Sequence, residues 1–215
     1  NEPAMSVVLE RAPATLTLAC AALLISVVLG IPAGIVAAVK RNSVSDAVIR
    51  VLALLGQCMP AFWLGIMLIM LFAVKLGWMP TGGAEDGLRS LILPAFTLGV
   101  FSAATICRLL RSNLIEVLGK EYIDVAKAKG LPKSKIIGKH ALKNAMSSII
   151  TILGMQFASL LGGSVITEQV FAWPGVGRLV IQSITTSDFA VVECIVFLMA
   201  VIFVVINFIV DVLYC

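Results

Sequence analysis

The chain has 215 residues, of which 60% are hydrophobic and only 13% are charged, and its formal net charge is +4. About 25% of the residues of a soluble domain are charged, and a soluble chain of this length lacks the interior to bury so much apolar surface. The composition therefore excludes a soluble globular protein and indicates that lipid is the solvent for most of the chain.

Five long runs of the sequence contain no charged residue, and a helix that crosses a bilayer needs about 20 apolar residues. The third and fifth runs are near the lower limit, and Phe189–Val192 extends the fifth, with Glu193 between them. The runs do not alternate apolar and polar residues, so membrane strands are excluded. We expect an all-α, polytopic membrane helical bundle with five membrane helices, forming one transmembrane domain over residues 1–215. The runs are Ala12–Val39, Val51–Val74, Ser90–Cys107, Asn144–Thr167 and Cys194–Val210.

Basic residues are distributed unevenly between the loops. With five helices, twelve of the 16 Lys and Arg residues lie on one side, which marks that side as cytoplasmic. Trp78 and Trp173 then fall near the outer interface, where indoles are favoured. The net charge is a topology signal rather than a sign of nucleic-acid binding. The predicted arrangement has the amino end, Gly77–Arg89 and Glu168–Asp188 outside, and Lys40–Arg50, Arg108–Lys143 and the carboxyl end inside.

The longest cytoplasmic loop, residues 108–143, has an ordered pattern. Tyr122, Val125, Ala126 and Lys129 recur at helical spacing and are predicted to share one face. Gly130 suits the left-handed turn after a helix, and Pro132 suits the start of the next. A second helix is expected from Lys133, with Ile136, Ile137 and His140 on one stripe. The loop thus reads as a helical hairpin under the membrane.

Two interpretations of this hairpin remain open on the residues alone. The lysines are explained by a topology anchor that only fixes orientation. Small residues such as Ala126 and Ala128, placed before Gly130, suit a surface that another protein approaches closely. Docking and plain anchoring are equally supported by this pattern.

The segment EYIDVAKAKGLPKSKIIGKHALKNA, residues 121–145, resembles the EAA loop of ABC-importer permeases, in the form found in the dipeptide, oligopeptide and nickel branch. Asp124–Val125–Ala126 stands where the founding pattern has Glu–Ala–Ala. Three other stretches resemble the same branch: residues 15–46, 59–83 and 166–193. The resemblance implies an ABC importer type I transmembrane domain whose usual first membrane helix and short tail are absent here, the intact chain having six helices.

The resemblance also implies a role for the loop. In that family the loop is a coupling element that sits in a groove of a separate ATPase subunit. Residues expected to contact this subunit, or to support the loop, are Tyr122, Ala126, Ala128, Gly130, Leu131, His140 and Asn144. The implied partners are a second homologous permease forming a heterodimer, two ABC ATPase subunits and an extracytoplasmic solute-binding protein.

The chain has no complete phosphate-binding loop. That motif needs four residues between its first Gly and a Gly–Lys–Ser/Thr, whereas seven separate Gly130 from Gly138 and His140 follows Lys139. Energy must then come from a bound ATPase or from an ion gradient. An ion-coupled secondary transporter is the alternative function, although such carriers usually hold an ionisable residue deep in the bilayer. Only Glu193 is a candidate for that role.

Polar residues inside the apolar runs are candidates for a translocation pathway. Gln57, Gln156, Ser159 and Asn207 are expected to face either a neighbouring helix or a water-filled cavity. Hydrogen bonding between helices and pathway lining both remain open. Gly30 and Gly34 favour close helix contact. Pro32, Pro60 and Pro94 are expected to be packing irregularities or kinks.

The outer segment EQVFAWPGVGRL, residues 168–179, is bent by glycines and proline, and Phe171 and Trp173 are expected to reach back to the interface. The resemblance places this region near the mouth that receives substrate from the binding protein. The residues predicted for that role are Glu168, Phe171, Pro174, Gly175 and Gly177. A structural plug or an interface anchor is the alternative.

The overall expectation is a permease subunit, not an enzyme, in a bacterial or archaeal plasma membrane. It carries dipeptides, oligopeptides or nickel, with glutathione-like compounds and sugars also open. No cysteine pair has metal-ligand spacing, so no metal site or disulfide is predicted. No cofactor is expected on this chain, since ATP and Mg²⁺ would bind the partner ATPase subunits.

Overall fold

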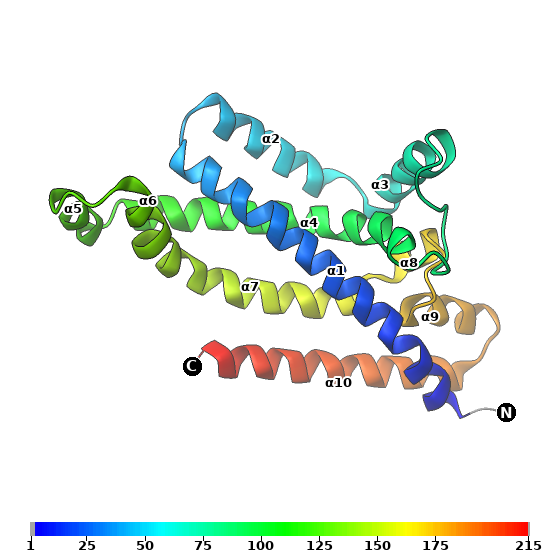
Figure 1. Cartoon of the computed structure of the whole chain (residues 1–215). Helices are drawn as coiled ribbons and strands as arrows, with labels where there is room; N and C mark the ends of the chain where they lie inside the picture. The colour runs from blue at the N-terminus through cyan, green and yellow to red at the C-terminus, as the bar shows by residue number, and fades with distance from the viewer. Residues whose placement is uncertain (1–2, 215) are drawn as a thin grey trace.

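The computed structural model describes the backbone of residues 3–214 and, apart from residues 147, 163, 210–211 and 213–214, their side chains. Every regular element in this part of the chain is helical. The long helices lie roughly along one axis with alternating chain direction, and the helical hairpin and the amino terminus lie at opposite ends of the molecule (Figure 1). This agrees with the all-α bundle predicted from composition.

Two long helices, α1 (Ala4–Val39) and α4 (Leu88–Leu118), form the centre of the bundle. Glycines let their backbones approach closely. A Cβ added at Gly30 would lie 2.8 Å from the carbonyl oxygen of Ala103, and one at Gly99 would lie 2.9 Å from that of Ala22. Gly34 similarly faces the backbone of Cys107. The predicted role of Gly30 and Gly34 in close helix packing is confirmed.

The prolines behave differently from one another. Pro32 lies inside α1 and Pro94 inside α4, and both helices continue through them. At Pro60 the chain breaks, because Met59 and Pro60 both adopt extended backbone angles, as the residue before a proline tends to do. The predicted single helix over Val51–Val74 is therefore wrong. It is replaced by α2 (Val44–Cys58), then α3 (Ala61–Leu68) and the π-helical η1 (Ile69–Lys75), bent by 102°.

The cytoplasmic hairpin has the predicted form. Helix α5 (Glu121–Ala128) is followed by a turn in which Gly130 has a φ of +72°, a conformation that glycine adopts without strain. Pro132 precedes α6 (Lys133–Lys135), and the π-helical η2 (Ile136–Ala141) leads into α7 (Leu142–Gly163). A break at Ser164 separates α7 from α8 (Val165–Val170), so the fourth run is shared between two helices.

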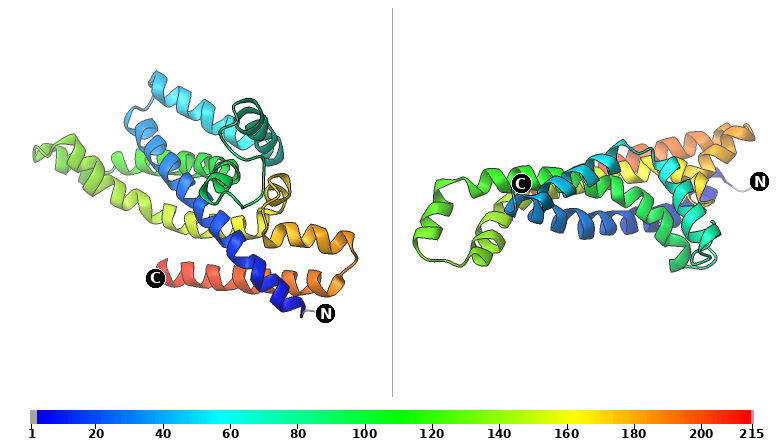
Figure 2. Two further views of the ribbon diagram at one scale, coloured as in Figure 1. Left: turned by 45° about the vertical axis from the view of Figure 1, so that its right-hand side comes forward. Right: turned by 90° about the horizontal axis from the view of Figure 1, so that it is seen from above.

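The remaining helices are α9 (Val176–Thr185) and α10 (Phe189–Tyr214). In the described part of the chain, α1, α4 and residues 189–209 of α10 are each long and apolar enough to cross a membrane. Two bent pairs, α2 with α3–η1 and the segments on either side of Ser147, bring the number of spans to five when each pair counts as one. The turn after α1 and the hairpin lie toward the same end in both views (Figures 1 and 2), which agrees with the predicted grouping of the basic loops.

A buried ion pair joins α2 to α4 near this end. The Asp46 side chain is fully buried and accepts two hydrogen bonds from Arg111, with Nε–Oδ1 and Nη2–Oδ2 distances of 2.7 and 2.8 Å. The backbone N–H of Asn42 donates to the same carboxylate at 3.0 Å, and Arg50 lies 3.4 Å from it. The bidentate geometry holds the two helices in a fixed register.

We predict that Asp46→Ala destabilises the fold by about 1.5–3 kcal/mol, because it removes the charged hydrogen bonds that the half-buried Arg111 guanidinium makes to Asp46. Thermal unfolding of the detergent-solubilised protein measures this effect. The matched control is Asp124→Ala, which removes an exposed pair with Lys127 at 2.8 Å and is expected to cost less than about 1 kcal/mol. Equal losses from the two variants would contradict the assigned role of Asp46.

Candidate functional site

The cytoplasmic hairpin is held on the bundle by an apolar cluster. Ile123 and Ala126 of α5 are buried with Leu114 and Val117, which belong to the last turns of α4. Ile136 and Ala141 of η2 and Ala145 of α7 complete the contact. The hairpin is thus an extension of α4 and α7 and packs as part of the same body.

The two faces of α5 are not divided as predicted. Tyr122 and Val125 are 41% and 54% exposed, and Lys129 is exposed as well, whereas Ala126 is only 7% exposed. The prediction that Ala126 shares their face is wrong, because Ala126 lies three residues after the buried Ile123 and therefore points inward with it. Ala128 and Gly130 are exposed and Leu131 is half-buried.

A hydrogen bond ties the hairpin to the start of α7. The amide nitrogen of Asn144 donates to the hydroxyl oxygen of Tyr122 at 2.8 Å and to the carbonyl oxygen of His140 at 3.2 Å. These three residues, separated by up to 22 positions in the sequence, are brought together. Asn144 thus links α5 to the start of α7, and His140 takes part through its backbone carbonyl only; the supporting role predicted for His140 and Asn144 stays a prediction.

A cavity of ≈ 360 Å³ lies between α2, α4 and α7; its wall is mainly apolar but carries five polar side chains, and it is called the polar cavity below. Gln57, Gln156 and Ser159 line it, together with Thr97 and Ser102 of α4. Asn207 is not among the lining residues. Its amide nitrogen donates instead to the carbonyl oxygen of Phe203 on its own helix at 2.8 Å. Three of the four polar residues predicted for a pathway are therefore gathered at one site, and the fourth is placed elsewhere.

Gln57 is held in one orientation by α4. Its amide nitrogen donates to the hydroxyl oxygen of Thr105 at 2.9 Å, and its amide oxygen accepts a hydrogen bond from the guanidinium of Arg108. Sequence reasoning missed Thr105 and Arg108, although their spacing of three places both on one face of α4. Arg108 brings a positive charge to the edge of a cavity whose lining residues are all uncharged.

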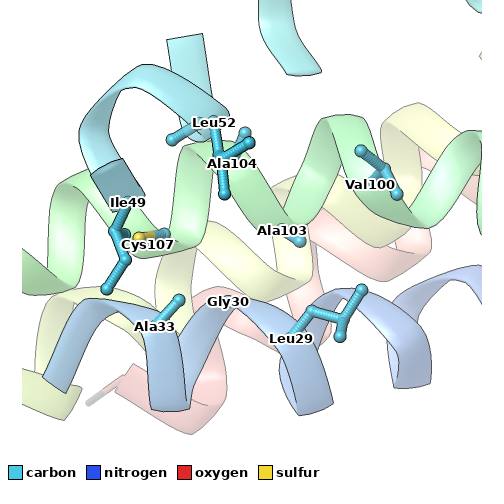
Figure 3. A pocket seen from close by; sticks show the side chains of 10 residues that line it. Leu29, Gly30, Ala33, Ile49, Leu52, Val100, Ala103, Ala104 and Cys107 are labelled. Atoms are coloured by element: carbon cyan, nitrogen blue, oxygen red, sulfur yellow. The ribbon is translucent and has the colours of Figure 1, made fainter. Parts of the chain in front are cut away.

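A second cavity, of ≈ 280 Å³, lies beside the first between α1, α2 and α4. Figure 3 shows its lining, which is made of aliphatic side chains such as Leu29, Ile49, Leu52 and Val100, with the Cys107 sulfur among them. It offers an apolar wall with almost no hydrogen-bonding groups. Of the two cavities, only the polar one has groups that can replace the hydration of a polar solute.

The outer segment is organised around the carboxylate of Glu168, which is fully buried. The hydroxyls of Thr15 and Ser164 donate to its Oε1 at 2.9 and 2.7 Å, and the backbone N–H of Arg178 donates to Oε2 at 3.0 Å. The Thr15 hydroxyl also accepts from the N–H of Val176 at 2.8 Å. The acid therefore links α1, α8 and α9.

Gly175 and Gly177 are required by this arrangement. A Cβ at Gly175 would overlap Oε2 of Glu168, and one at Gly177 would lie 2.7 Å from the Cα of Val165.

Phe171 and Trp173 are 2% and 5% exposed, and the indole nitrogen of Trp173 donates to the Ala14 carbonyl oxygen at 2.9 Å. The prediction that these two aromatics reach the lipid interface is wrong, because the turn folds them into the protein. Trp78 is 62% exposed.

Residues 30–214 match the family described as the binding-protein-dependent transport system inner membrane component. The chain belongs to this permease family. The glutathione transport system permease protein GsiC of Escherichia coli is 42% identical over 214 residues, covering 100% of this chain and 70% of the relative. A putative peptide transport system permease protein of Brucella abortus is 41% identical over 221 residues with the same coverage.

Solved structures agree on the fold of this permease. The MetNI methionine ABC transporter, in an inward-facing form, contains a chain that matches with a TM-score of 0.84 at 21% identity, covering 100% of this chain and 97% of that one. An amino acid ABC transporter matches with a TM-score of 0.77 at 17% identity, over 97% and 93% of the two chains. The fold is that of an ABC-importer transmembrane domain, as the resemblance of the hairpin sequence implied.

These findings establish the class of function. The protein is a multi-pass inner-membrane permease subunit of an ABC importer. Family membership decides between the two energy sources that the sequence left open, and the ion-coupled secondary transporter is set aside.

We predict that Gly175→Ala in this permease lowers the stability of the isolated subunit by about 1–3 kcal/mol, the usual cost of overpacking. The added methyl would displace Glu168 from its three donors. Thermal unfolding in detergent measures the loss. Gly162→Ala is the matched control, because nothing lies within 4 Å of a Cβ there and alanine suits a helix better than glycine. Similar midpoints for Gly175→Ala and Gly162→Ala would refute the packing assigned to Gly175.

Proposed function

We propose that this permease carries peptides or peptide-like compounds across a bacterial plasma membrane, driven by ATPase subunits that bind its cytoplasmic hairpin. The curated relatives that share about two fifths of its residues are named as glutathione and peptide transport permeases, which favours this substrate class over nickel. The observation that carries the mechanism is that one helix, α4, contacts both the hairpin and the polar cavity.

The exposed face of the hairpin is the proposed ATPase-binding surface. It presents Tyr122, Val125, Ala128 and Gly130, and the neighbouring turn adds Leu131. Exposed apolar side chains on a cytoplasmic helix are costly unless a partner covers them, and the small residues at the end of α5 allow a groove to approach. Ala126 contributes from the inner face by seating the helix, instead of touching the partner.

In this proposal, a displacement of the hairpin is transmitted to the polar cavity by α4 and by the Asp46–Arg111 ion pair that joins α4 to α2. Leu114 and Val117 contact the hairpin, and Arg111, one turn earlier, holds Asp46 of α2. Further along α4, Thr105 and Arg108 hold Gln57, at the edge of the cavity. A displacement of the hairpin therefore moves α4 and α2 together, and the cavity between them and α7 changes shape.

The polar cavity is proposed as this subunit's share of the translocation pathway. Its volume of ≈ 360 Å³ is in the usual range for small-molecule sites. The other share is assigned to a second homologous permease, with which this chain forms a heterodimer over two ATPase subunits. ATP and Mg²⁺ belong to those ATPase subunits, and no cofactor is assigned to this chain.

The outer segment is proposed to lie under the solute-binding protein. A small cavity of ≈ 200 Å³ opens beside it, lined by Arg11, Arg178 and Gln182 and by the backbone at Pro174 and Gly175. Glu168 is buried beneath Gly175 at this surface, whereas Phe171 is buried against Gly65 and Gly82. The two guanidinium groups suit a partner that presents carboxylates there.

We predict that Gly130→Arg prevents coupling while the chain still inserts in the membrane. A side chain at this exposed turn meets no atom within 4 Å in the isolated subunit, so apart from the strain of a φ of +72° its effect falls on the docked ATPase. In the reconstituted transporter, substrate-stimulated ATP hydrolysis is expected to fall by about tenfold or more, as for a charge placed in the centre of an interface.

Gly130→Asn separates this effect from backbone strain. Asparagine tolerates the left-handed conformation better than other residues and adds no charge. It is expected to retain most of the coupled ATPase activity. If Gly130→Arg hydrolyses ATP and transports substrate as the unmodified complex does, the hairpin turn is not part of the ATPase-binding surface.

A further inference from the structure

The break between α2 and α3 forms one wall of the polar cavity. The residues on both sides of the break, from Gln57 to Ala61, all line it. Opposite them lie Gln156 and Ser159 of α7, with Thr97 and Ser102 of α4 between. The cavity is therefore built around an interrupted helix, and the interruption is at the cavity rather than at a loop outside the bundle.

The interruption leaves backbone acceptors without donors. Pro60 has no N–H, and the 102° bend carries the N–H groups that follow it away from α2. The last bond of α2 runs from the N–H of Met59 to the carbonyl oxygen of Leu55 at 3.1 Å. Within residues 3–214, no backbone N–H donates to the carbonyl oxygens of Gln57, Cys58 or Met59. All three of these residues line the cavity.

Gln57 and Met59 are half-buried and Cys58 is exposed at the cavity. Carbonyl groups at membrane depth are costly unless something donates to them. The end of a helix also carries a partial negative charge, which favours donors over acceptors as ligands. The lining side chains carry no formal charge, and the Arg108 guanidinium at the edge of the cavity already donates to the amide oxygen of Gln57. The ligand group that suits these carbonyl oxygens is therefore an uncharged N–H, which can donate a hydrogen bond to them.

We propose that the α2–α3 break binds the backbone N–H groups of a peptide in transit, through the carbonyl oxygens of Gln57, Cys58 and Met59. This inference rests on the proposed function, since it assigns a site within the proposed pathway. Gln156 and Ser159 face the same peptide from α7. Recognition of the main chain is independent of the substrate's side chains, which suits a passage that admits peptides of different sequence.

The proposal is tested with an amide tripeptide and with its depsipeptide, in which an ester oxygen replaces one backbone N–H. Each is supplied to the reconstituted transporter at a concentration that saturates the solute-binding protein, so that equal amounts of loaded binding protein are compared. The unmodified complex is expected to transport the amide about tenfold faster than the ester, the effect of one hydrogen bond to a group that is otherwise left unpaired.

Pro60→Ala supplies a backbone N–H and allows α2 to continue as a helix. The carbonyl oxygens at the end of α2 would then accept hydrogen bonds from within the helix and would no longer be available to the peptide. In this variant the rate ratio of amide to ester is expected to fall to about one. Pro32→Ala is the matched control, because Pro32 also lies in a membrane helix but is exposed and outside the cavity. It is expected to keep the tenfold ratio.

Equal rates for amide and ester in the unmodified complex would overturn this inference, and so would an undiminished ratio in Pro60→Ala. Either result would leave ATP-dependent peptide transport itself intact. Absence of ATP-dependent uptake of both compounds would instead overturn the proposed function, and the inference with it. The comparison in the unmodified complex does not depend on a variant that folds.

Discussion

One continuous helix sets the mechanical properties of this permease. Helix α4 runs for 31 residues without a break, although it contains Pro94. At about 1.5 Å per residue it is roughly 46 Å long, enough to pass from the cytoplasmic hairpin through the bilayer core. Its inner end packs on Ile123 and Ala126, and its outer half lines the polar cavity with Thr97 and Ser102. This continuity gives a rigid connection between the cytoplasmic hairpin, which we propose binds an ATPase, and the polar cavity, which we propose lies on the substrate pathway.

Helix α2 has the complementary property. It is fixed to α4 at its start by the Asp46–Arg111 pair and further along by Gln57, and it then ends abruptly at Pro60. A broken helix exposes backbone groups that an unbroken one keeps for itself, and such groups occur in membranes where they line a cavity. The fold thus places a rigid helix and an interrupted helix on two sides of one site. In the proposed mechanism the first transmits movement from the hairpin, and the second offers backbone carbonyls to the substrate.

Much of this architecture was predictable from the sequence, because uncharged runs of about 20 residues have few solutions in a bilayer. The hairpin was predictable as well, since Gly130 and Pro132 mark its turn. Sequence patterns did not distinguish Pro60, where the helix breaks, from Pro32, where it continues, because whether a helix continues through a proline depends on support from neighbouring helices. Ala126 was assigned to the wrong face, since one turn of a short helix offers several small residues at helical spacing.

Other features depend on contacts between distant parts of the chain. Asp46 and Arg111 are 65 residues apart, and Thr15 and Glu168 are 153 apart, so no local pattern connects them. Phe171 and Trp173 have the composition of an interfacial pair and are nevertheless folded inside. Asn207 is satisfied by its own helix. The sequence singled out Glu168, Phe171, Trp173 and Asn207, but not Asp46, Arg111 or Thr15, and only the fold shows which partners these side chains have.

The central claim, that an ATPase binds the outward face of the hairpin, is tested most directly by crosslinking from neighbouring positions of α5. Single cysteines are placed at Val125, which is exposed, and at Ile123, which is buried, in a chain without other cysteines, and are treated with a short thiol-to-amine crosslinker in the assembled transporter. The account predicts that Val125→Cys captures an ATPase subunit and that Ile123→Cys yields only crosslinks within the permease. Capture of no ATPase subunit from Val125→Cys, or labelling of that position from the extracytoplasmic side, would contradict it.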